Sequence, residues 1–426
     1  MKDFFVKEAE KKIEVAGNYD VIIAGSGPSG FAAAVTAARN GAKTLIIEAQ
    51  SSIGGVSTSG LMSHFTGRVE SKIYSEILER SHSNDFFECS DKTKIDPELL
   101  KNTYLEMLSE AGVDILLYTF VCDVIKSGNR ITGVVTESKS GRKAYLADVI
   151  IDATGDGDVA YRAGAEYFKG RESDGKMQPA TLMFKVGGVD MSRAVFPTSF
   201  ETTVETDKGE LQSLAKKHLP FPAGHVLLYS STIPGIVTCN MTNCIDIDGT
   251  KAEELTRAEI VCRSQMQPIV EFLRKYVPGY ENCYIISAAS LIGIRETRHF
   301  IGLKQITEND IIEARQFEDR VVHGAWFNFD IHNISGASLD KTGVQKYFKQ
   351  QNGYSIPYGC MVPIKTEGLL LTGRNISGTH MAHSSFRAMP ICVGIGEACG
   401  AAAAIAVKEN INLRDVSPEE IRKLIF

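Results

Sequence analysis

The sequence lacks closely spaced cysteine pairs. Its nine cysteines lie at positions 89, 122, 239, 244, 262, 283, 360, 392 and 399, and no two of them form a C-x-x-C motif. Iron–sulfur and zinc centres commonly use such pairs, so we predict no metal site. The odd number of cysteines is typical of reduced thiols, and we therefore expect a cytoplasmic protein.

Basic runs and long apolar runs are also absent. The chain has 46 Lys and Arg against 52 Asp and Glu, a net charge of -6, and we expect no binding to nucleic acid. The longest apolar stretch, Ile391 to Val407, contains Glu397 and three glycines, so we expect no membrane insertion. The amino-terminal stretch MKDFFVKEAEKKIEVAG has no uninterrupted apolar core, and we expect no signal peptide.

The composition is that of an ordinary globular protein. Apolar residues make up 43% of the chain and charged residues 23%. A chain of 426 residues exceeds the size at which a single hydrophobic core stops growing. We therefore expect two domains.

A glycine motif near the amino terminus is the strongest functional signal. It lies in the stretch YDVIIAGSGPSGFAAAVTAARNGAKTLIIE, residues 19–48. Gly25, Gly27 and Gly30 follow a short apolar strand and precede a helix, in the G-x-G-x-x-G spacing. In dinucleotide-binding folds the first glycine allows a tight turn, the second lets the pyrophosphate approach, and the third packs helix on strand.

A second predicted strand, Lys43 to Glu48, follows this helix and ends in an acidic residue. Glu48 comes 18 residues after Gly30, where a carboxylate can accept a hydrogen bond from a ribose hydroxyl. The alternative is a surface turn with Glu48 as a solvated strand end. The full order of strand, turn, helix, strand and acid favours the binding of an ADP moiety.

The rest of the first half alternates between helices and strands. Helices are predicted at Lys72 to Arg80 and, after an Asp96 N-cap, up to Glu110. A β-meander follows over 113–154 and ends in the motif DATGDGD. The glycine doublet of residues 54 and 55 lies in a small polar loop, which is either a binding loop or a plain linker.

The second half has no further strand–turn–helix glycine motif. An amphipathic helix is predicted from Lys251 to Val277, with a proline at 268. Near the carboxyl end, GLLLTG reads as a strand, residues 378–390 as a polar loop, and ICVGIGEACGAAAAIAV as a helix. The three glycines of that last helix are expected to allow close packing and not to bind a nucleotide.

These motifs together resemble the bacterial FAD-dependent oxidoreductase family. The resemblance lies in YDVIIAGSGPSGFAAA, IEAQSSIGG, DATGDGDVA, IRETR, LLLTGRNISGTH and FRAMPICVGIGEACGAAAA, and it extends over residues 19–407. It implies an α/β fold: a Rossmann-like FAD-binding domain of the glutathione-reductase type, which has three layers in the order ββα, with an inserted α+β substrate domain. The expected parts are 1–164, 165–360 and 361–426. It also implies a distant relationship to fumarate reductase and succinate dehydrogenase flavoproteins.

The resemblance also implies which residues hold the cofactor. Glu48 would bind the adenosine ribose, and Val121 or Cys122 would meet the adenine through backbone groups. The helix that begins near Met389 would direct its amino end at the flavin, where its dipole stabilises negative charge. The full implied set of FAD contacts is Gly25, Gly27, Pro28, Ser29, Gly30, Glu48, Gly54, Gly55, Val121, Cys122, Thr154, Gly155, Asp156, Gly373 and Arg374.

The expected chemistry is hydride transfer between a small organic substrate and flavin N5. It needs a group that handles a proton and a group that holds the substrate. We predict that His64, His380, His383 and Arg387 supply them, because histidine titrates near neutrality and arginine pairs with anions. Each histidine would otherwise be an ordinary hydrogen-bonded loop residue.

Two further arginines are candidates for the site, and two alternative functions are considered. Arg295 and Arg298 are further candidates for the site, although ion pairs with Glu296 are favoured for them. The spacing of His64 from Gly55 does not favour a covalent flavin link. The alternatives are a flavin monooxygenase that uses NAD(P)H and oxygen, and a non-catalytic flavoprotein. The electron acceptor or donor is not identified by the sequence.

Overall fold

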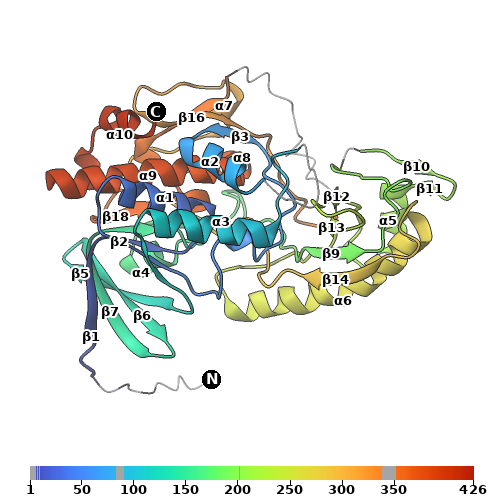
Figure 1. Cartoon of the computed structure of the whole chain (residues 1–426), viewed down its shortest axis with the longest axis horizontal. Helices are drawn as coiled ribbons and strands as arrows, with labels where there is room; N and C mark the ends of the chain where they lie inside the picture. Colours follow the sequence, from blue (N-terminus) through green and yellow to red (C-terminus); the bar gives the residue numbers. More distant parts are fainter. Residues whose placement is uncertain (1–5, 7, 9, 83–90, 201, 338–351) are drawn as a thin grey trace.

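The computed structural model describes residues 6, 8, 10–82, 91–200, 202–337 and 352–426. Figure 1 shows two lobes. One lobe combines the blue and cyan amino-terminal elements with the red carboxyl-terminal helices, and the other is formed by the green and yellow middle of the chain. Part of the predicted amino-terminal lead-in and Cys89 lie outside the described residues.

A mixed sheet forms the centre of the first lobe. Its parallel part has the spatial order β4, β2, β1, β7, β18. The strands are β1 (Glu14–Ala24), β2 (Thr44–Ile47), β4 (Asp114–Leu116), β7 (Gly141–Asp152) and β18 (Leu369–Leu371). The predicted meander adds β5 (Phe120–Ser127) and β6 (Arg130–Ser138), antiparallel to one another and to the start of β7. The α/β fold with a Rossmann-like core is confirmed, and both ends of the chain contribute to one sheet.

Side-chain caps begin two helices of this lobe, one of them at the predicted Asp96. α2 (Lys72–Arg80) starts after Ser71, whose side chain accepts a hydrogen bond from the backbone N–H of Tyr74. α3 (Pro97–Glu110) starts after Asp96, which accepts from Glu98 and Leu99. Such caps satisfy backbone donors that the first helical turn leaves unpaired. The other helices are α1 (Pro28–Arg39), α4 (Asp158–Ala163), α7 (Glu308–Ile312), α8 (His380–Phe386), α9 (Met389–Glu409) and α10 (Pro418–Ile425).

Short strands and single helical turns complete this lobe and its border with the second. A three-stranded sheet has the order β17 (Tyr354–Pro357), β16 (Arg320–Trp326), β3 (Arg68–Glu70), and a two-stranded one joins β8 (Tyr167–Lys169) to β15 (Arg298–Phe300). The 3-10 turns are η1 (Gly55–Ser57), η2 (Tyr358–Cys360), η3 (Gly373–Asn375) and η4 (Leu413–Asp415).

The second lobe is α+β, as predicted. Its four-stranded sheet has the order β12 (Leu228–Ser230), β13 (Val237–Cys239), β9 (Phe184–Gly187), β14 (Tyr284–Ala288). It carries α5 (Leu211–His218), the long α6 (Ala252–Tyr276) and the small pair β10 (Glu205–Thr206) and β11 (Gly209–Glu210). In Figure 1, α6 runs beneath this sheet.

Two separate hydrophobic cores underlie the two lobes. The second core contains buried residues from Ala180 to Ala289. The first contains residues from Val21 to Ala165 and then, beginning again at Phe300, residues up to Ile425. Hydrophobic residues of the first core therefore begin again at Phe300. Other described residues before 337 contact the second lobe, as Gly336 does with Asn243, and the boundary at residue 360 stays a prediction.

Glycines let α9 pack directly against the backbone of α1. A Cβ added at Gly396 would overlap the carbonyl group of Ser29, and one added at Gly400 would overlap the carbonyl oxygen of Ala33. These positions therefore serve close helix packing, as the sequence indicates. In Figure 1, α9 and α1 lie one above the other on the same side of the sheet.

α9 is longer and more apolar than the sequence analysis allowed. By length and composition its 21 residues could cross a membrane, although we expected no segment of that kind. Its most apolar window is 94% buried within the protein. Burial on all sides explains why the helix has no polar face.

A helix also replaces part of the predicted polar loop of residues 378–390. α8 begins after Thr379, whose side chain accepts a hydrogen bond from the N–H of Ala382. Seven residues are too few to show a helical period, and the Thr379 cap was the only local signal of this helix.

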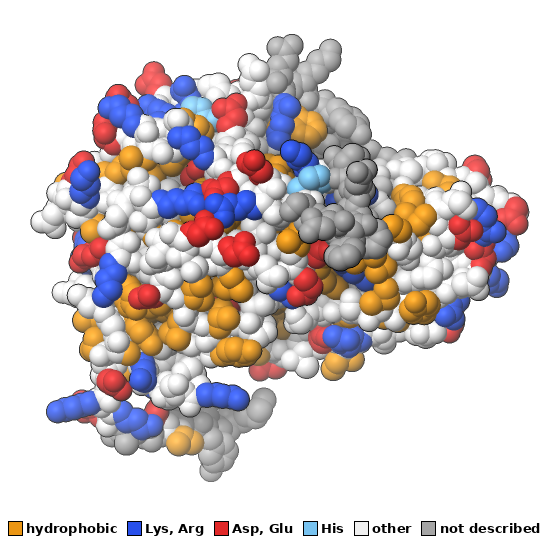
Figure 2. Space-filling model, in the orientation of Figure 1, with side chains coloured by type: hydrophobic (Ala, Val, Ile, Leu, Met, Phe, Trp, Pro, Cys, Tyr) orange, Lys and Arg blue, Asp and Glu red, His pale blue; other side chains and the backbone are white. Residues whose placement is uncertain are grey.

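On the face seen in Figure 2, acidic and basic side chains are interspersed, in keeping with their similar numbers.

The packing of α9 on α1 makes a stability prediction. We expect Gly396→Ala to lower the free energy of unfolding by about 1–3 kcal/mol relative to Gly394→Ala, measured by urea denaturation. Both changes gain the same helix propensity. At 394 the new methyl group meets the side chain of Val69, which can rotate, whereas at 396 it meets the backbone of Ser29. Equal stabilities would mean that the two helices can separate without cost.

Candidate active site

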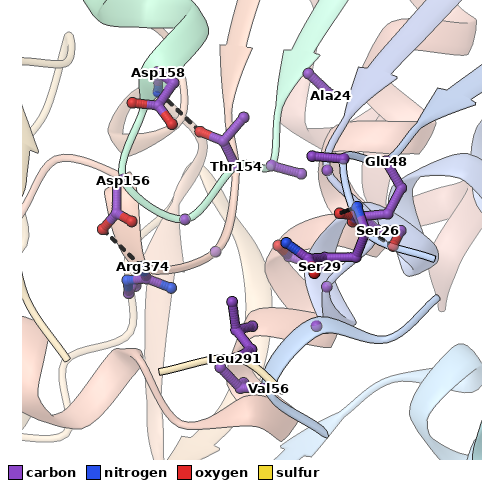
Figure 3. A pocket seen from close by; sticks show the side chains of 18 of the residues that line it. Ala24, Ser26, Ser29, Glu48, Val56, Thr154, Asp156, Asp158, Leu291 and Arg374 are labelled. Atoms are coloured by element: carbon purple, nitrogen blue, oxygen red, sulfur yellow. Dashed lines mark hydrogen bonds and ion pairs between the residues drawn. The ribbon is translucent and has the colours of Figure 1, made fainter. Parts of the chain in front are cut away.

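A long cleft lies at the carboxyl ends of β1, β2 and β7 and beside η3. Its cavity volume is about 290 Å³, near the lower end of the ~300–1,000 Å³ of ordinary small-molecule pockets. Ligands of open α/β sheets bind at this edge. Figure 3 shows Ser26, Ser29 and Glu48 on one side of the cleft, with Asp156 and Arg374 on the other.

The glycine turn forms the floor of this cleft. Gly25 has a φ of 96°, a left-handed conformation that favours glycine, and it packs against Ala153. A Cβ built on Gly27 has no heavy atom within 4 Å, so the backbone there faces open space. α1 begins at Pro28 with no side-chain cap, which leaves its amino-terminal N–H groups available to an anion.

Glu48 is fixed at the cleft rim by three hydrogen bonds. Its Oε2 accepts from the backbone N of Ser26 at 2.9 Å and from the Ser26 hydroxyl at 2.6 Å. Its Oε1 accepts from the N of Gln50 at 2.8 Å. A carboxylate has about four acceptor positions, so Glu48 keeps capacity for a ribose hydroxyl.

The opposite wall is an ion-paired network at the end of β7. Asp156 accepts a hydrogen bond from Arg374 and another from the Thr297 hydroxyl, each at 2.7 Å. Asp152, the last residue of β7, accepts from Thr154 and from the N of Ala160, and complete burial raises its pKa to about 6. The strand end, η3 and the inserted half are thereby tied together.

The predicted FAD contacts line this cleft with three exceptions. Gly30 packs below the turn against Gly25 and Ala153. The N–H of Gly54 donates to the carbonyl oxygen of Ser26, and the Cys122 thiol donates to the carbonyl oxygen of Val135. The wall also includes residues that the sequence analysis missed: Gln50, Thr119, Leu291, Ile292, Ile294, Met389 and Cys392.

A second cavity, the chamber, opens beside the start of α9. Its cavity volume is about 170 Å³, and it shares Val56, Ile294, Arg374, Arg387 and Met389 with the cleft. Both lobes contribute to it. Its other lining residues are Gly60, Met62, Thr66, Thr181, Met183, Asn240, Gly293, Arg295, Phe327, Asp330, His332 and Ala388.

Positive charge exceeds negative charge in the chamber. Arg387 donates from Nη2 to the carbonyl oxygen of Asp330 at 2.8 Å and to its Oδ2 at 3.0 Å. Arg295 donates from Nη1 to two neutral acceptors, the carbonyl oxygen of Pro179 and the hydroxyl of Thr181. Burial, with the nearby charge of Arg387, lowers the pKa of Arg295 to about 10, so Arg295 remains charged at neutral pH.

An acid and an imidazole stand beside these arginines. Burial opposes ionisation of Asp330, but His332 and the arginines hold the pKa of its carboxyl well below its usual range. Burial and the charge of Arg295 lower the pKa of His332 to about 4. His332 Nε2 lies 3.5 Å from Asp330 Oδ1. The imidazole is therefore neutral at pH 7 and able to accept a proton.

Of the four predicted catalytic side chains, Arg387 lines both cavities and the three histidines line neither. His64 Nδ1 contacts the Ser63 hydroxyl at 2.8 Å, and its Nε2 contacts the Thr66 hydroxyl at 3.1 Å. His380 and His383 lie on α8 and are buried beside Glu296. The three imidazoles therefore lie outside both cavities, and their catalytic role stays a prediction.

The predicted ion pairs of Arg295 and Arg298 with Glu296 are wrong. Arg298 pairs with Asp158 at 3.0 Å, and Arg295 turns into the chamber. The Glu296 carboxylate instead accepts hydrogen bonds from His299 and His380. Side chains that follow one another in IRETR point in different directions, so sequence neighbours do not pair.

The fold and the two cavities define a flavoenzyme of the glutathione-reductase type. A family model described as FAD dependent oxidoreductase matches residues 20–425, and the chain belongs to that family. Its cofactor is FAD. The uncapped start of α1, the open face of Gly27 and the fixed Glu48 carboxylate fit the pyrophosphate and ribose of this cofactor.

More distant similarities cover part of the relatives or show the fold alone. Thiamine thiazole synthase of Methanococcus maripaludis is 34% identical over 151 residues, which cover 32% of this chain and 55% of that protein. A geranylgeranyl bacteriochlorophyll reductase-like protein from Thermoplasma acidophilum has a TM-score of 0.51 at 15% identity, covering 97% of this chain and 83% of that one. The p-nitrophenol 4-monooxygenase of Pseudomonas putida has a TM-score of 0.50 at 12% identity, covering 96% and 84%. They give no specific support to a relationship with fumarate reductase, which stays a prediction.

The open face of Gly27 makes a prediction about FAD retention. We expect Gly27→Val to fold, because no protein atom lies within 4 Å of the added Cβ, and to lose most of its FAD, because the side chain enters the pyrophosphate space. Circular dichroism and the ratio of flavin to protein absorbance measure the two outcomes. Ala38→Val, at a half-buried position of the same helix, is the control and should keep FAD. Full flavin occupancy in Gly27→Val would contradict this placement of the pyrophosphate.

Proposed function

We propose that this protein transfers a hydride between a small anionic organic substrate in the chamber and FAD in the cleft. The observation that carries the proposal is the continuity of the two cavities at the start of α9, where Arg387 belongs to both. When bound, FAD supplies the hydride acceptor or donor. The chain's own residues bind the substrate, orient it and handle its proton.

The charge balance of the chamber supports an anionic substrate. Arg295 and Arg387 face one carboxylate, Asp330, while His332 is neutral. The Nε of Arg387 is buried without a hydrogen-bond partner among the described residues. A guanidinium prefers two-point pairing with a carboxylate, and a buried positive charge is costly until it is paired. A substrate carboxylate would balance the excess positive charge of the chamber.

His332 is the candidate for the proton step. Its imidazole is 7% exposed and belongs to the chamber wall, and its pKa lies below neutrality, so it can accept a proton from a substrate carbon or hydroxyl group. Asp330 lies beside it and can stabilise the charge that then forms. The sequence analysis missed both residues because stretch 301–360 shows no clear period.

The proposal is tested by anaerobic titration of the FAD-loaded protein against a panel of hydroxy, amino and unsaturated carboxylic acids, with absorbance followed in the flavin band. Each acid is paired with its methyl ester or amide. We expect an acid to bleach or restore the flavin band and its neutral partner to fail. NADPH consumption that requires oxygen would instead support a monooxygenase. A flavin that no small molecule reduces or reoxidises would support a non-catalytic flavoprotein.

Arg387 provides the first kinetic prediction. We expect Arg387→Ala to retain FAD and to slow flavin reduction by the substrate at least about tenfold, because a charge-assisted contact is lost. Rapid-mixing absorbance measures the rate. The control is Arg414→Ala, at an exposed position in η4, which should keep the original rate. Unchanged rates in both variants would move substrate binding away from the chamber.

His332 provides the second kinetic prediction. We expect His332→Asn to slow flavin reduction by roughly 10²–10⁴-fold with little change in substrate affinity, because general base catalysis is worth that much. His218→Asn, on exposed α5, serves as the control. In the original protein the group with pKa about 4 stays unprotonated from pH 5 to 8, so the rate should not fall as the pH is lowered across that range. A rate that falls below pH 7 with a histidine-like pKa would contradict this assignment.

A further inference from the structure

A buried cluster of one carboxylate and three imidazoles lies between α8 and the segment that lines both cavities. It consists of Glu296, His299, His380 and His383, and we call it the His–Glu cluster. None of the four is more than 4% exposed, and none lines the cleft or the chamber. The proposed reaction makes no use of them.

The cluster brings metal-ligating atoms close together. Glu296 Oε1 lies 2.8 Å from His299 Nε2 and 2.6 Å from His380 Nδ1. One ligating atom each of Glu296, His299 and His383 lies within 4.8 Å of the other two. A tetrahedral ion bound at the usual 2.0–2.1 Å sets its ligand atoms roughly 3.4 Å apart. Small side-chain rotations would close that difference.

Hydrogen bonds within the protein do not satisfy the cluster. The Nδ1 atoms of His299 and His383 are buried without a partner among the described residues. The ring of His299 stacks on Phe168, with centroids 4.8 Å apart, and its edge meets the ring of His383. Both imidazoles are therefore held in place while part of their hydrogen-bonding capacity is unused. Unsatisfied buried polar atoms of this kind call for a physical explanation.

We propose that Glu296, His299 and His383 bind one divalent transition-metal ion, with His380, the third imidazole of the cluster, hydrogen-bonded to Glu296. A carboxylate and neutral imidazoles suit Zn²⁺, Fe²⁺ and Mn²⁺ more than they suit Ca²⁺ or Mg²⁺, which prefer oxygen ligands. Because no member lines a cavity, the ion has a structural role and does not touch the substrate. The inference does not depend on the proposed function.

The position of the cluster gives the ion a definite task. Glu296 directly follows Arg295, and His299 lies in β15 of the inserted segment. His383 lies in α8, whose C-cap is Arg387. An ion held by these ligands would therefore fix the distance between Arg295 and Arg387, which line the chamber from different parts of the chain.

The test measures metal retention directly. Untagged, FAD-loaded protein is incubated separately with Zn²⁺, Mn²⁺ and, without oxygen, Fe²⁺, then desalted and analysed for metal content. We expect about one equivalent of at least one of these ions per chain. Glu296→Gln and His383→Phe should retain none. The control is His323→Phe, whose imidazole packs on Phe426 outside the cluster and which should retain the ion.

A second measurement separates ion binding from a folding defect. A strong chelator should lower the midpoint of thermal unfolding of the original protein and of His323→Phe, and leave the ligand variants unchanged. Absence of all three ions from the desalted original protein would overturn the proposal, as would equal retention in the original protein and both ligand variants. If the ligand variants do not fold, the metal content and the chelator response of the original protein decide.

Discussion

Direct backbone contact between α1 and α9 is the constraint on which both cavities depend. Gly396 lies against Ser29 and Gly400 against Ala33, so the two helices run in the same direction where they touch. α1 begins one residue before Ser29, and α9 begins seven residues before Gly396. The amino end of α9 therefore extends about 9 Å beyond the amino end of α1. The two helix dipoles therefore point at different parts of one elongated ligand site, one at the glycine turn and one where cleft and chamber meet.

The inserted lobe supplies charge that the sheet cannot. Parallel strand ends provide backbone and small side chains, which suit a cofactor with a pyrophosphate. Arg295 comes from the segment between the two lobes, and it meets Arg387 from the carboxyl-terminal part. Two guanidinium groups in a closed space are tolerable only if anions accompany them. Asp330 is one such anion, and a bound substrate is the natural second.

Local chemistry decided what could be predicted from the sequence. The glycine turn, the Asp96 cap and the meander turns each depend on residues that are close together in the sequence. All three appear at the expected positions. The close-packing role of Gly396 could be inferred because small residues along a helix allow another element to approach it closely. An ADP-binding unit followed from the order of these local signals, and FAD followed from the resemblance to the oxidoreductase family.

Contacts between distant residues could not be read in the same way. His332 gains its role from Arg295 and Asp330, and Glu296 gains its partners from residues 178, 299 and 380. His380 and His383 sit near the cofactor-binding helix in the sequence, but the short helix α8 turns them towards Glu296. The position of a histidine next to the cofactor-binding helix in the sequence therefore did not determine whether its side chain faces the cofactor cleft.

The pairing of β18 with β7 has a consequence for how the chain is made. Ile150 to Asp152 are translated early, yet their partners Leu369 to Leu371 follow more than two hundred residues later. Until then the end of β7 at Ile150 to Asp152 is an open strand edge on that side, which invites pairing with other chains. Contacts of such large sequence separation also form slowly. The first lobe can therefore close its sheet only after the second lobe has been synthesised, and the nascent chain must be protected from aggregation during that interval.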